Sequence, residues 1–520
     1  MDRNTMISQL KNSPEIFDFV VIGGGATGLG VALDAATRGY RVALFEQADF
    51  TKGTSSRSTK LVHGGVRYLA QGDIALVLEA LRERGLLRQN AAHLVKDQTF
   101  LIPCYRWWEG PFYTIGLVLY DLMAGNLAFG RSICIGPKRV KQTIPTLQPK
   151  HLTAGVLYHD GQFDDSRLAI NLARTAVDAG ACVLNYTKVV ALLKADNMIA
   201  GVKVRDEETG EMCEVKARCV VNATGVFADE ILQMIEPGRR ATVRPSQGVH
   251  LVLDASFLQS DSAIMIPKTS DGRVLFAVPW HNKVVVGTTD TLMEHPSKEP
   301  VALEKEIQFI LDTAAQYLTR PPKRSDVLSV FAGLRPLAAS QSEGKATKEI
   351  SRSHKLIRDK SGLITIIGGK WTTYRKMAQD TIDLALRSME IEKKPCVTEH
   401  YPIHGCKKNP NFSDPLYVYG TDAENIRKLV ASSKQMQEKL HPDYSFTVGE
   451  ATWLIRHEMV RTLEDVLARR LRVLFLDARA AVKMAPKVAA IMAEEQGRDA
   501  SWVSDQVKAF EAVASNYILS

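Results

Sequence analysis

The sequence predicts an α/β fold with a Rossmann-like nucleotide-binding domain, an interleaved antiparallel β-sheet domain and a C-terminal helical domain. A glycine-rich strand–turn–helix unit fills residues 17–46, alternating strand patterns fill 240–350, and helical patterns follow residue 390. We therefore expect the nucleotide-binding domain at about 15–90, 150–240 and 350–390. The β-sheet domain should occupy about 91–149 and 241–349, and the helical domain 391–520.

Composition places the chain among large globular proteins. Its 520 residues allow two or three domains, and 45% of them are hydrophobic. The net charge of +8 favours anionic ligands or an anionic membrane surface. The sequence lacks the concentrated basic run that is typical of a nucleic-acid-binding protein. The seven cysteines include no C-x-x-C pair, so we expect free thiols and no metal site. We expect no signal peptide and no transmembrane helix, since no long uncharged apolar run occurs.

The nucleotide-binding unit opens with an apolar run, Phe17–Ile22, that predicts a buried parallel strand. Gly23, Gly25 and Gly28 follow at the spacing G-x-G-x-x-G. The first glycine permits the tight turn, the second lets a pyrophosphate approach the backbone, and the third lets helix and strand pack closely. The spacing therefore predicts a dinucleotide site rather than a glycine-rich turn of another α/β protein.

The next elements strengthen this interpretation. A helical pattern covers 29–38, and its N-terminus, with Ala26 and Thr27 before it, would present unpaired N–H groups to phosphates. A second strand at 41–45 ends in Glu46, eighteen residues past Gly28, where an acid can bind a ribose hydroxyl. Strand, helix, second strand and acid thus occur in the order that the motif requires.

A loop rich in serine and threonine follows at 47–69 and leads to an apolar helix near 74–87. A surface loop is the alternative interpretation. Because the loop follows the acid directly, it can supply donors to a cofactor pyrophosphate or flavin ring, with Arg67 and Tyr68 beside the ring. The candidate cofactor-binding residues of this loop are Thr54, Ser55, Ser56, Ser58, Lys60, Leu61, His63, Gly64 and Gly65.

The segment 90–149 is aromatic and apolar, and Pro103, Gly110 and Pro111 should break it before a long helix forms. A buried helix of the β-sheet domain is the favoured interpretation. The alternative is an amphipathic segment in a membrane interface, with Trp107 and Trp108 near the headgroups together with Arg106 and Lys138.

Residues 153–225 should return to the nucleotide-binding domain. Asp165 or Ser166 is the expected N-cap of an apolar helix, and an antiparallel ribbon should turn at 208–210. The ribbon leads to a buried strand, 219–222, and a turn of small residues that includes Ala223 and Gly225.

Two basic residues and a histidine stand out between 240 and 352. His250 lies at the edge of an expected strand. Arg335 sits between Gly-Leu and Pro, and proline restricts the residue before it, so a fixed guanidinium there suits bidentate binding of a phosphate. Arg352 is a second candidate. A surface salt bridge is the ordinary alternative for each arginine.

An apolar strand at 363–367 runs into Gly368-Gly369, and Lys370 follows at the start of a helix. The glycine spacing is not that of a P-loop. A helix N-terminus and an ammonium here can still stabilise negative charge on a reduced flavin or on a substrate phosphate, and Thr372 can donate to the ring.

Several of these motifs together resemble the FAD-dependent glycerol-3-phosphate dehydrogenases, within the D-amino-acid-oxidase-like flavoproteins. The resemblance rests on VVIGGGATGLG, KLVHGGVRYL, VVNATGVFAD, AGLRPL and IIGGKWTTYR, and covers residues 15 to 390, with a weaker match beyond. It implies FAD as cofactor, contacts from the Ala223–Gly225 turn and Gly369, and peripheral attachment to the inner face of the cell membrane from the cytoplasm. It also implies a quinone as electron acceptor. We expect a homodimer whose helical domain supports the body.

The resemblance implies oxidation of sn-glycerol 3-phosphate to dihydroxyacetone phosphate by hydride transfer to FAD. Arg335, Arg352 and Lys370 would hold the phosphate, and Arg67 and Tyr68 would orient the hydroxyl end. His250 is the first candidate for the base and His63 the second, since histidine titrates near working pH.

Three alternatives remain open at this point. Oxygen is the second candidate acceptor, which would make the protein a glycerol-3-phosphate oxidase. An amine or amino-acid oxidase of the same fold is another, although phosphate-suited arginines argue against it. A flavin-binding membrane scaffold without turnover belongs to a different class.

Overall fold

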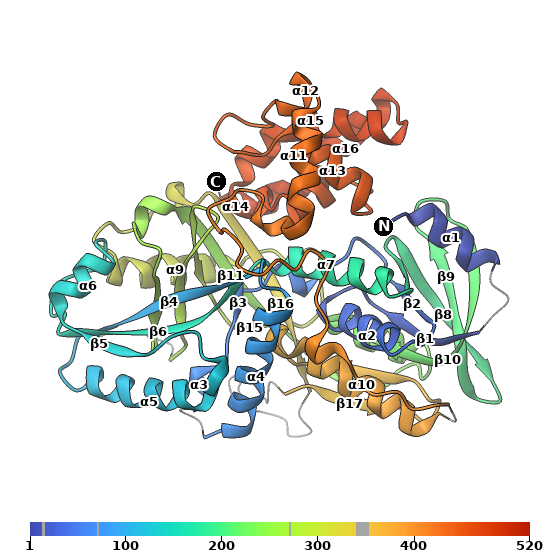
Figure 1. Ribbon diagram of the computed structural model, residues 1–520, viewed down its shortest axis with the longest axis horizontal. Helices are drawn as coiled ribbons and strands as arrows, with labels where there is room; N and C mark the ends of the chain where they lie inside the picture. The colour runs from blue at the N-terminus through green and yellow to red at the C-terminus, as the bar shows by residue number, and fades with distance from the viewer. Residues whose placement is uncertain (13–15, 70–71, 270–271, 340–352, 390, 520) are drawn as a thin grey trace.

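The computed structural model describes residues 1–520 except 13–15, 70–71, 270–271, 340–352, 390 and 520. Two sheets lie beside one another, and the C-terminal helices sit over the region where they meet (Figure 1). The fold class predicted from the sequence is therefore confirmed.

The first sheet holds the dinucleotide motif. Its central strands run parallel in the order β18-β10-β1-β2-β7, and they are buried on both faces, which explains their unbroken apolar runs. Strands β8 and β9 extend β10 as the antiparallel ribbon that the sequence predicts. The strands are β1 (Phe17–Ile22), β2 (Val42–Phe45), β7 (Cys182–Leu184), β8 (Thr187–Ala195), β9 (Met198–Asp206), β10 (Met212–Asn222), β17 (Lys355–Arg358) and β18 (Ile364–Ile367).

Helix α2 (Ala26–Thr37) packs between α7 (Asp165–Asp178) and α10 (Tyr374–Ser388) on this sheet. Helix α2 begins three residues before the expected start, so Gly25 is its N-cap and Gly28 lies in its first turn. Helix α7 is capped by Asp164, whose Oδ1 accepts from the backbone N–H groups of Ser166 and Arg167. The predicted caps, Asp165 and Ser166, are therefore wrong by one or two positions, because both residues already lie inside the helix.

The second sheet is mostly antiparallel, in the order β15-β11-β14-β13-β12-β4-β6-β3, with β16 on β11 and β5 on β6. Strands β4 and β12 form a parallel pair. Strands β3 and β6 belong here, although the sequence placed them in the nucleotide-binding ranges. The strands are β3 (Leu61–Val62), β4 (Val95–Cys104), β5 (Ile133–Ile135), β6 (Ala154–Phe163), β11 (Val243–Asp254), β12 (Ala263–Ile266), β13 (Leu275–Trp280), β14 (Lys283–Gly287), β15 (Thr291–Leu292) and β16 (Ser329–Ala338).

Helix α5 (Glu109–Ala124) corrects two expectations. Gly110 and Pro111 do not prevent a long helix, because they lie in its first turn, where proline is tolerated. The helix is also not buried: Ile115 and Leu122 are each 72% exposed. Its outer apolar surface, which we call the α5 face, comprises Phe112, Ile115, Val118, Leu119 and Leu122.

The remaining helices pack around the sheets or form the C-terminal region, which also contains a π-helical segment, Asp465–Arg470. None of the helices in the described ranges is long and apolar enough to cross a membrane. The helices are α1 (Arg3–Asn12), α3 (Val66–Leu69), α4 (Ile74–Asn90), α6 (Pro137–Thr143), α8 (Ala228–Gln233), α9 (Glu304–Tyr317), α11 (Ala423–Ala431), α12 (Lys434–Gln437), α13 (Val448–His457), α14 (Val473–Leu476), α15 (Ala478–Gln496) and α16 (Ala500–Ala514).

Candidate active site

A cavity of about 460 Å³ lies between the two sheets, where the carboxyl ends of β1 and β10 meet β11 and β16. Crevices at the carboxyl ends of parallel strands are the usual ligand sites of such folds. Most of the residues that the sequence assigned to cofactor or substrate line this cavity, so the fold brings them together.

The motif glycines form the turn at one end of the cavity. Gly23 has φ +109°, and a Cβ there would lie 2.7 Å from the carbonyl oxygen of Ala223. A Cβ on Gly28 would lie 1.9 Å from the oxygen of Gly23, so this residue serves helix packing and does not itself line the cavity. Gly25 and the first residues of α2 remain at the cavity wall, where the helix N-terminus can meet a phosphate.

Glu46 ends β2 beside this turn. Its Oε2 accepts from Gly24 N at 2.6 Å, and its Oε1 accepts from Ala48 N at 2.9 Å. Burial raises the pKa of the Glu46 carboxyl, while the two backbone donors oppose that shift. The fixed carboxylate at the cavity wall is suited to accept a hydrogen bond from a ribose hydroxyl.

The hydroxyl-rich loop has two sides. Thr54, Ser55 and Ser58 line the cavity, and Ser55 Oγ accepts from Ala26 N at 2.9 Å. Ser56 and Lys60 point the other way. The ammonium of Lys60 donates to Asp165 Oδ2 and to Ser56 O at 2.7 and 2.6 Å and is fully buried, so neither residue lines the cavity.

The turn His63-Gly64-Gly65 closes one wall of the cavity. His63 and Gly65 line it, with Leu61 before them. Thr372 Oγ1 accepts from His63 N at 3.1 Å, which ties this turn to the segment after β18. Gly64 lies behind the wall, and its N–H donates to the hydroxyl of Tyr120 at 2.7 Å. The hydroxyl-rich loop thus continues along the cavity into helix α3.

His250 lies on β11, lines the cavity and is 2% exposed. Its ring stacks on Phe331, and its Nε2 lies 3.0 Å from Thr59 Oγ1. Its Nδ1 is buried and has no hydrogen-bond partner in the part of the chain that the structure describes. Burial, with the charges of Lys60 and Arg335, holds the pKa of His250 well below 6.5, so the imidazole is neutral at pH 7.

Arg335 lies on β16, in register with β11. Its Nη2 donates to Thr288 Oγ1 at 2.9 Å and to Thr289 O at 3.0 Å, and Asp290 lies 3.6 Å from its Nη1. These contacts fix the plane of the guanidinium at the cavity wall. A guanidinium held in this way is suited to bind a phosphate.

Lys370 and Tyr68 both line the cavity and contact one another, with the ammonium 4.0 Å from the centre of the ring. Gly369 lies beside Lys370, and Ala223 and Gly225 line the nearby wall. Arg67 lies in α3, and its side chain is not described. Arg352 falls outside the described residues.

Other lining residues were not identified from the sequence. Thr59 and Thr288 are side chains in stretches already singled out, whereas Tyr158, Asp160 and Phe276 reach the cavity only through the pairing of the second sheet. Tyr158 and Asp160 lie in β6, and the sequence offered no signal that this strand borders the site.

The lining fits FAD. An extended dinucleotide needs a glycine turn, an acid for the ribose, donors along the pyrophosphate and a flat pocket for the ring. The Gly23–Gly28 turn, Glu46, the hydroxyl-rich loop and the His63–Gly65 turn provide these around one cavity. The hydrogen bond from Ala26 N to Ser55 Oγ joins this loop to the first turn of α2, where a phosphate would lie.

Comparison with known proteins agrees with an FAD site. Residues 18–375 match the family of FAD dependent oxidoreductases, and residues 364–502 match the C-terminal domain of alpha-glycerophosphate oxidase. A mitochondrial glycerol-3-phosphate dehydrogenase of Arabidopsis thaliana is 40% identical over 93% of this chain and 84% of its own length. The human mitochondrial glycerol-3-phosphate dehydrogenase is 37% identical over 96% of this chain and 72% of its own.

Among solved structures, the glycerol-3-phosphate dehydrogenase of Bacillus halodurans complexed with FAD superposes with a TM-score of 0.81 and 27% identity, covering 99% of this chain and 97% of that one. The cofactor predicted from the sequence, FAD, is therefore confirmed. On this evidence the chain belongs to the FAD dependent oxidoreductases, in the family of the FAD-dependent glycerol-3-phosphate dehydrogenases.

Proposed function

We propose that this protein oxidises sn-glycerol 3-phosphate to dihydroxyacetone phosphate. One observation carries the proposal: a fixed guanidinium, Arg335, and a buried neutral imidazole, His250, share a single cavity with the dinucleotide-binding residues. A phosphate anchor, a base and a cofactor site are the groups that this oxidation requires. The names of the relatives support the same substrate.

The oxidation removes a hydride from C2 and a proton from the C2 hydroxyl. FAD, when bound, supplies the hydride acceptor. Arg335 binds the substrate phosphate and thereby sets the position of C2 along the cavity. Lys370 and Arg352 add positive charge for the phosphate, and Arg67 and Tyr68 orient the hydroxyl end.

We assign the base to His250. We place the ring hydrogen on the buried Nδ1, which leaves Nε2 as the basic nitrogen. The Thr59 hydroxyl, 3.0 Å away, gives its proton to Nε2 and takes the proton of the C2 hydroxyl in its place. A neutral imidazole can accept that proton without first losing one of its own. The second candidate, His63, also lines the cavity, in the turn that is hydrogen-bonded to Thr372.

We assign the role of electron acceptor to a membrane quinone, reached from the cytoplasmic face of the membrane. The α5 face supports this assignment, since it is apolar, exposed and preceded by Trp107, which is 83% exposed. Large exposed apolar surfaces are uncommon on proteins that meet only water. The net charge of +8 favours an anionic lipid surface.

The test is the visible absorption spectrum of the purified flavoprotein, recorded without air before and after addition of glycerol 3-phosphate. We expect the oxidised flavin bands to bleach, and a quinone added afterwards to restore them. A spectrum unchanged by glycerol 3-phosphate but bleached by an amine or a 2-hydroxy acid would overturn the substrate assignment while keeping the cofactor.

A further inference from the structure

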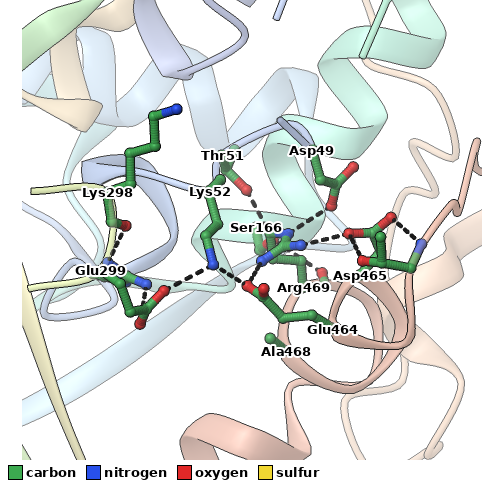
Figure 2. Close-up of polar contacts among 12 residues, drawn as sticks. Asp49, Thr51, Lys52, Ser166, Lys298, Glu299, Glu464, Asp465, Ala468 and Arg469 are labelled. Carbon is green, nitrogen blue, oxygen red and sulfur yellow. Dashed lines mark hydrogen bonds and ion pairs between the residues drawn. The ribbon is translucent and has the colours of Figure 1, made fainter. Parts of the chain in front are cut away.

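The hydroxyl-rich loop is held from behind by the C-terminal helical region. Thr51, Lys52, Thr54 and Arg57 all line the cofactor cavity. On the far side of the loop, Lys52 Nζ contacts Glu299 Oε2 at 2.7 Å and Glu464 Oε1 at 2.5 Å (Figure 2). Glu464 belongs to the C-terminal region, more than 400 residues further along the chain.

Arg57 forms a second link to the same region. Its Nη2 donates to Glu299 Oε1 at 2.7 Å and to the hydroxyl of Tyr517 at 3.0 Å. Tyr517 in turn donates to Glu299 Oε1 at 2.7 Å. The Arg57 side chain is 2% exposed and Tyr517 is 4% exposed, so the contact between them is shielded from water.

The charges of this network are balanced. Burial disfavours the ionised form of Glu299, but Arg57 and Lys52 outweigh it and hold the pKa of that carboxyl below its usual range. Arg469 and Lys52 likewise lower the pKa of Glu464 to about 2 against the effect of burial. Removing one charged member leaves an uncompensated buried charge, so the network resists separation of the loop from the C-terminal region.

The same network fixes the walls of the cavity. A Cβ on Gly333 would lie 2.9 Å from both Cβ and O of Arg57, which shows how closely the loop packs on β16, two residues before Arg335. Thr54 Oγ1 donates to Leu334 O at 2.6 Å. Arg57 Nη1 also donates to Lys298 O at 3.1 Å. Lys298 lines the cavity, and its ammonium points away from the network (Figure 2).

A neighbouring cluster anchors the network on the helical side. Arg469 Nε lies 2.6 Å from Asp49 Oδ2, and its Nη2 lies 2.5 Å from Asp465 Oδ1 (Figure 2). Asp49 lies near the start of the hydroxyl-rich loop, and all three side chains are at most 2% exposed. Arg469 therefore holds the start of the loop through Asp49, and Glu464 and Tyr517 hold it further along through Lys52 and Arg57.

We propose that the C-terminal helical region is part of the cofactor site, and that Tyr517 and Glu464 are positioning residues that hold loop 51–58 against FAD. In this role the C-terminal region does more than support the body of the protein as a packed helical domain. It depends on the cofactor and not on the substrate, so it stands even if glycerol 3-phosphate fails to reduce the flavin.

The test measures retention of FAD by the holoenzyme. Tyr517→Phe keeps the ring that packs on Phe475 and removes only the hydroxyl. Glu464→Gln keeps the shape and removes the charge. After dilution, release is followed by the rise in flavin fluorescence. We expect each variant to release FAD about tenfold faster than the parent, the factor that ~1.4 kcal/mol supplies.

A matched control is Tyr419→Phe, which removes a buried tyrosine hydroxyl that donates to Glu450 at 2.6 Å, in the same region but away from the loop. A merely structural role would lower the thermal stability of target and control variants alike and leave FAD release unchanged. A positioning role also shifts the visible spectrum of the bound flavin in the target variants.

The proposal fails if Tyr517→Phe and the control release FAD at the same rate as the parent with unaltered spectra. Glu464→Gln is a separate test, because Glu464 contacts Lys52 and Arg469 and not Arg57. Should either variant not fold, the other gives the answer, because the two act on different residues of the loop.

Discussion

Tyr120 joins the exposed helix α5 to the turn beside the cofactor cavity. Its hydroxyl accepts from Gly64 N at 2.7 Å and donates to Asp160 Oδ2 at 2.8 Å. Asp160 Oδ1 accepts from Arg84 Nη1 at 2.7 Å. Tyr120 and Arg84 are each 1% exposed, so water does not compete for these bonds. A Cβ on Gly64 would lie 2.5 Å from the Tyr120 hydroxyl, which shows how closely the two residues pack.

The variant Tyr120→Phe keeps the ring and removes both hydrogen bonds. The buried N–H of Gly64 then has no acceptor, which costs about 1–3 kcal/mol, and Asp160 loses a bond to a charged group worth ~1.5–3 kcal/mol. Because the two losses share one hydroxyl and are not additive, we expect the turn to be destabilised locally by about 2–4 kcal/mol. At ~1.4 kcal/mol for each factor of ten, even the lower value is about a 30-fold change in local opening.

Hydrogen–deuterium exchange measures this directly. The peptide that spans residues 61–66 should lose protection by about 30-fold or more, while the peptide that spans β1 should not change. Tyr419→Phe is the control, since it removes a comparable hydroxyl far from the turn. Unchanged protection of residues 61–66 would refute the reasoning, because it would mean that Tyr120 does not hold Gly64.

Three further predictions concern function. His250→Asn should lower turnover by about 10²- to 10⁴-fold with flavin content unchanged. Because the pKa of His250 lies well below 6.5, turnover of the parent enzyme should stay level as the pH falls through 6.5. A break in the pH profile at that value would exclude His250 as the base. Arg335→Lys should raise KM for glycerol 3-phosphate by about 10- to 150-fold, since it loses one charge-assisted hydrogen bond of ~1.5–3 kcal/mol; an unchanged KM in steady-state kinetics would remove Arg335 from the phosphate site. Ile115→Glu should abolish sedimentation with anionic vesicles without affecting anaerobic flavin reduction. Val301→Glu, at another exposed apolar position, should leave both vesicle binding and flavin reduction unchanged. Equal vesicle binding by both variants would count against the α5 face.

Local sequence was sufficient for the nucleotide-binding unit. Strand β1 has the predicted bounds, and the glycines and Glu46 lie where the motif requires, because a strand, a tight turn and a helix start are decided by residues close together in the chain. The N-cap of α7 was misplaced because Asp164, Asp165 and Ser166 are all good capping residues and only the backbone geometry selects one.

The rest was decided by tertiary structure. Whether α5 is buried depends on what packs against it, and its apolar composition suits a core and an interface equally. The contacts of Thr59 with His250, of Tyr120 with Gly64 and of Arg57 with Tyr517 join residues 56 to 460 positions apart. Sequence alone determined the strand, the glycine turn and the acid of the nucleotide-binding unit, since local chemistry dictates them. Only the fold decided which distant side chains share one buried volume, because that depends on how the two sheets and the C-terminal helices pack together.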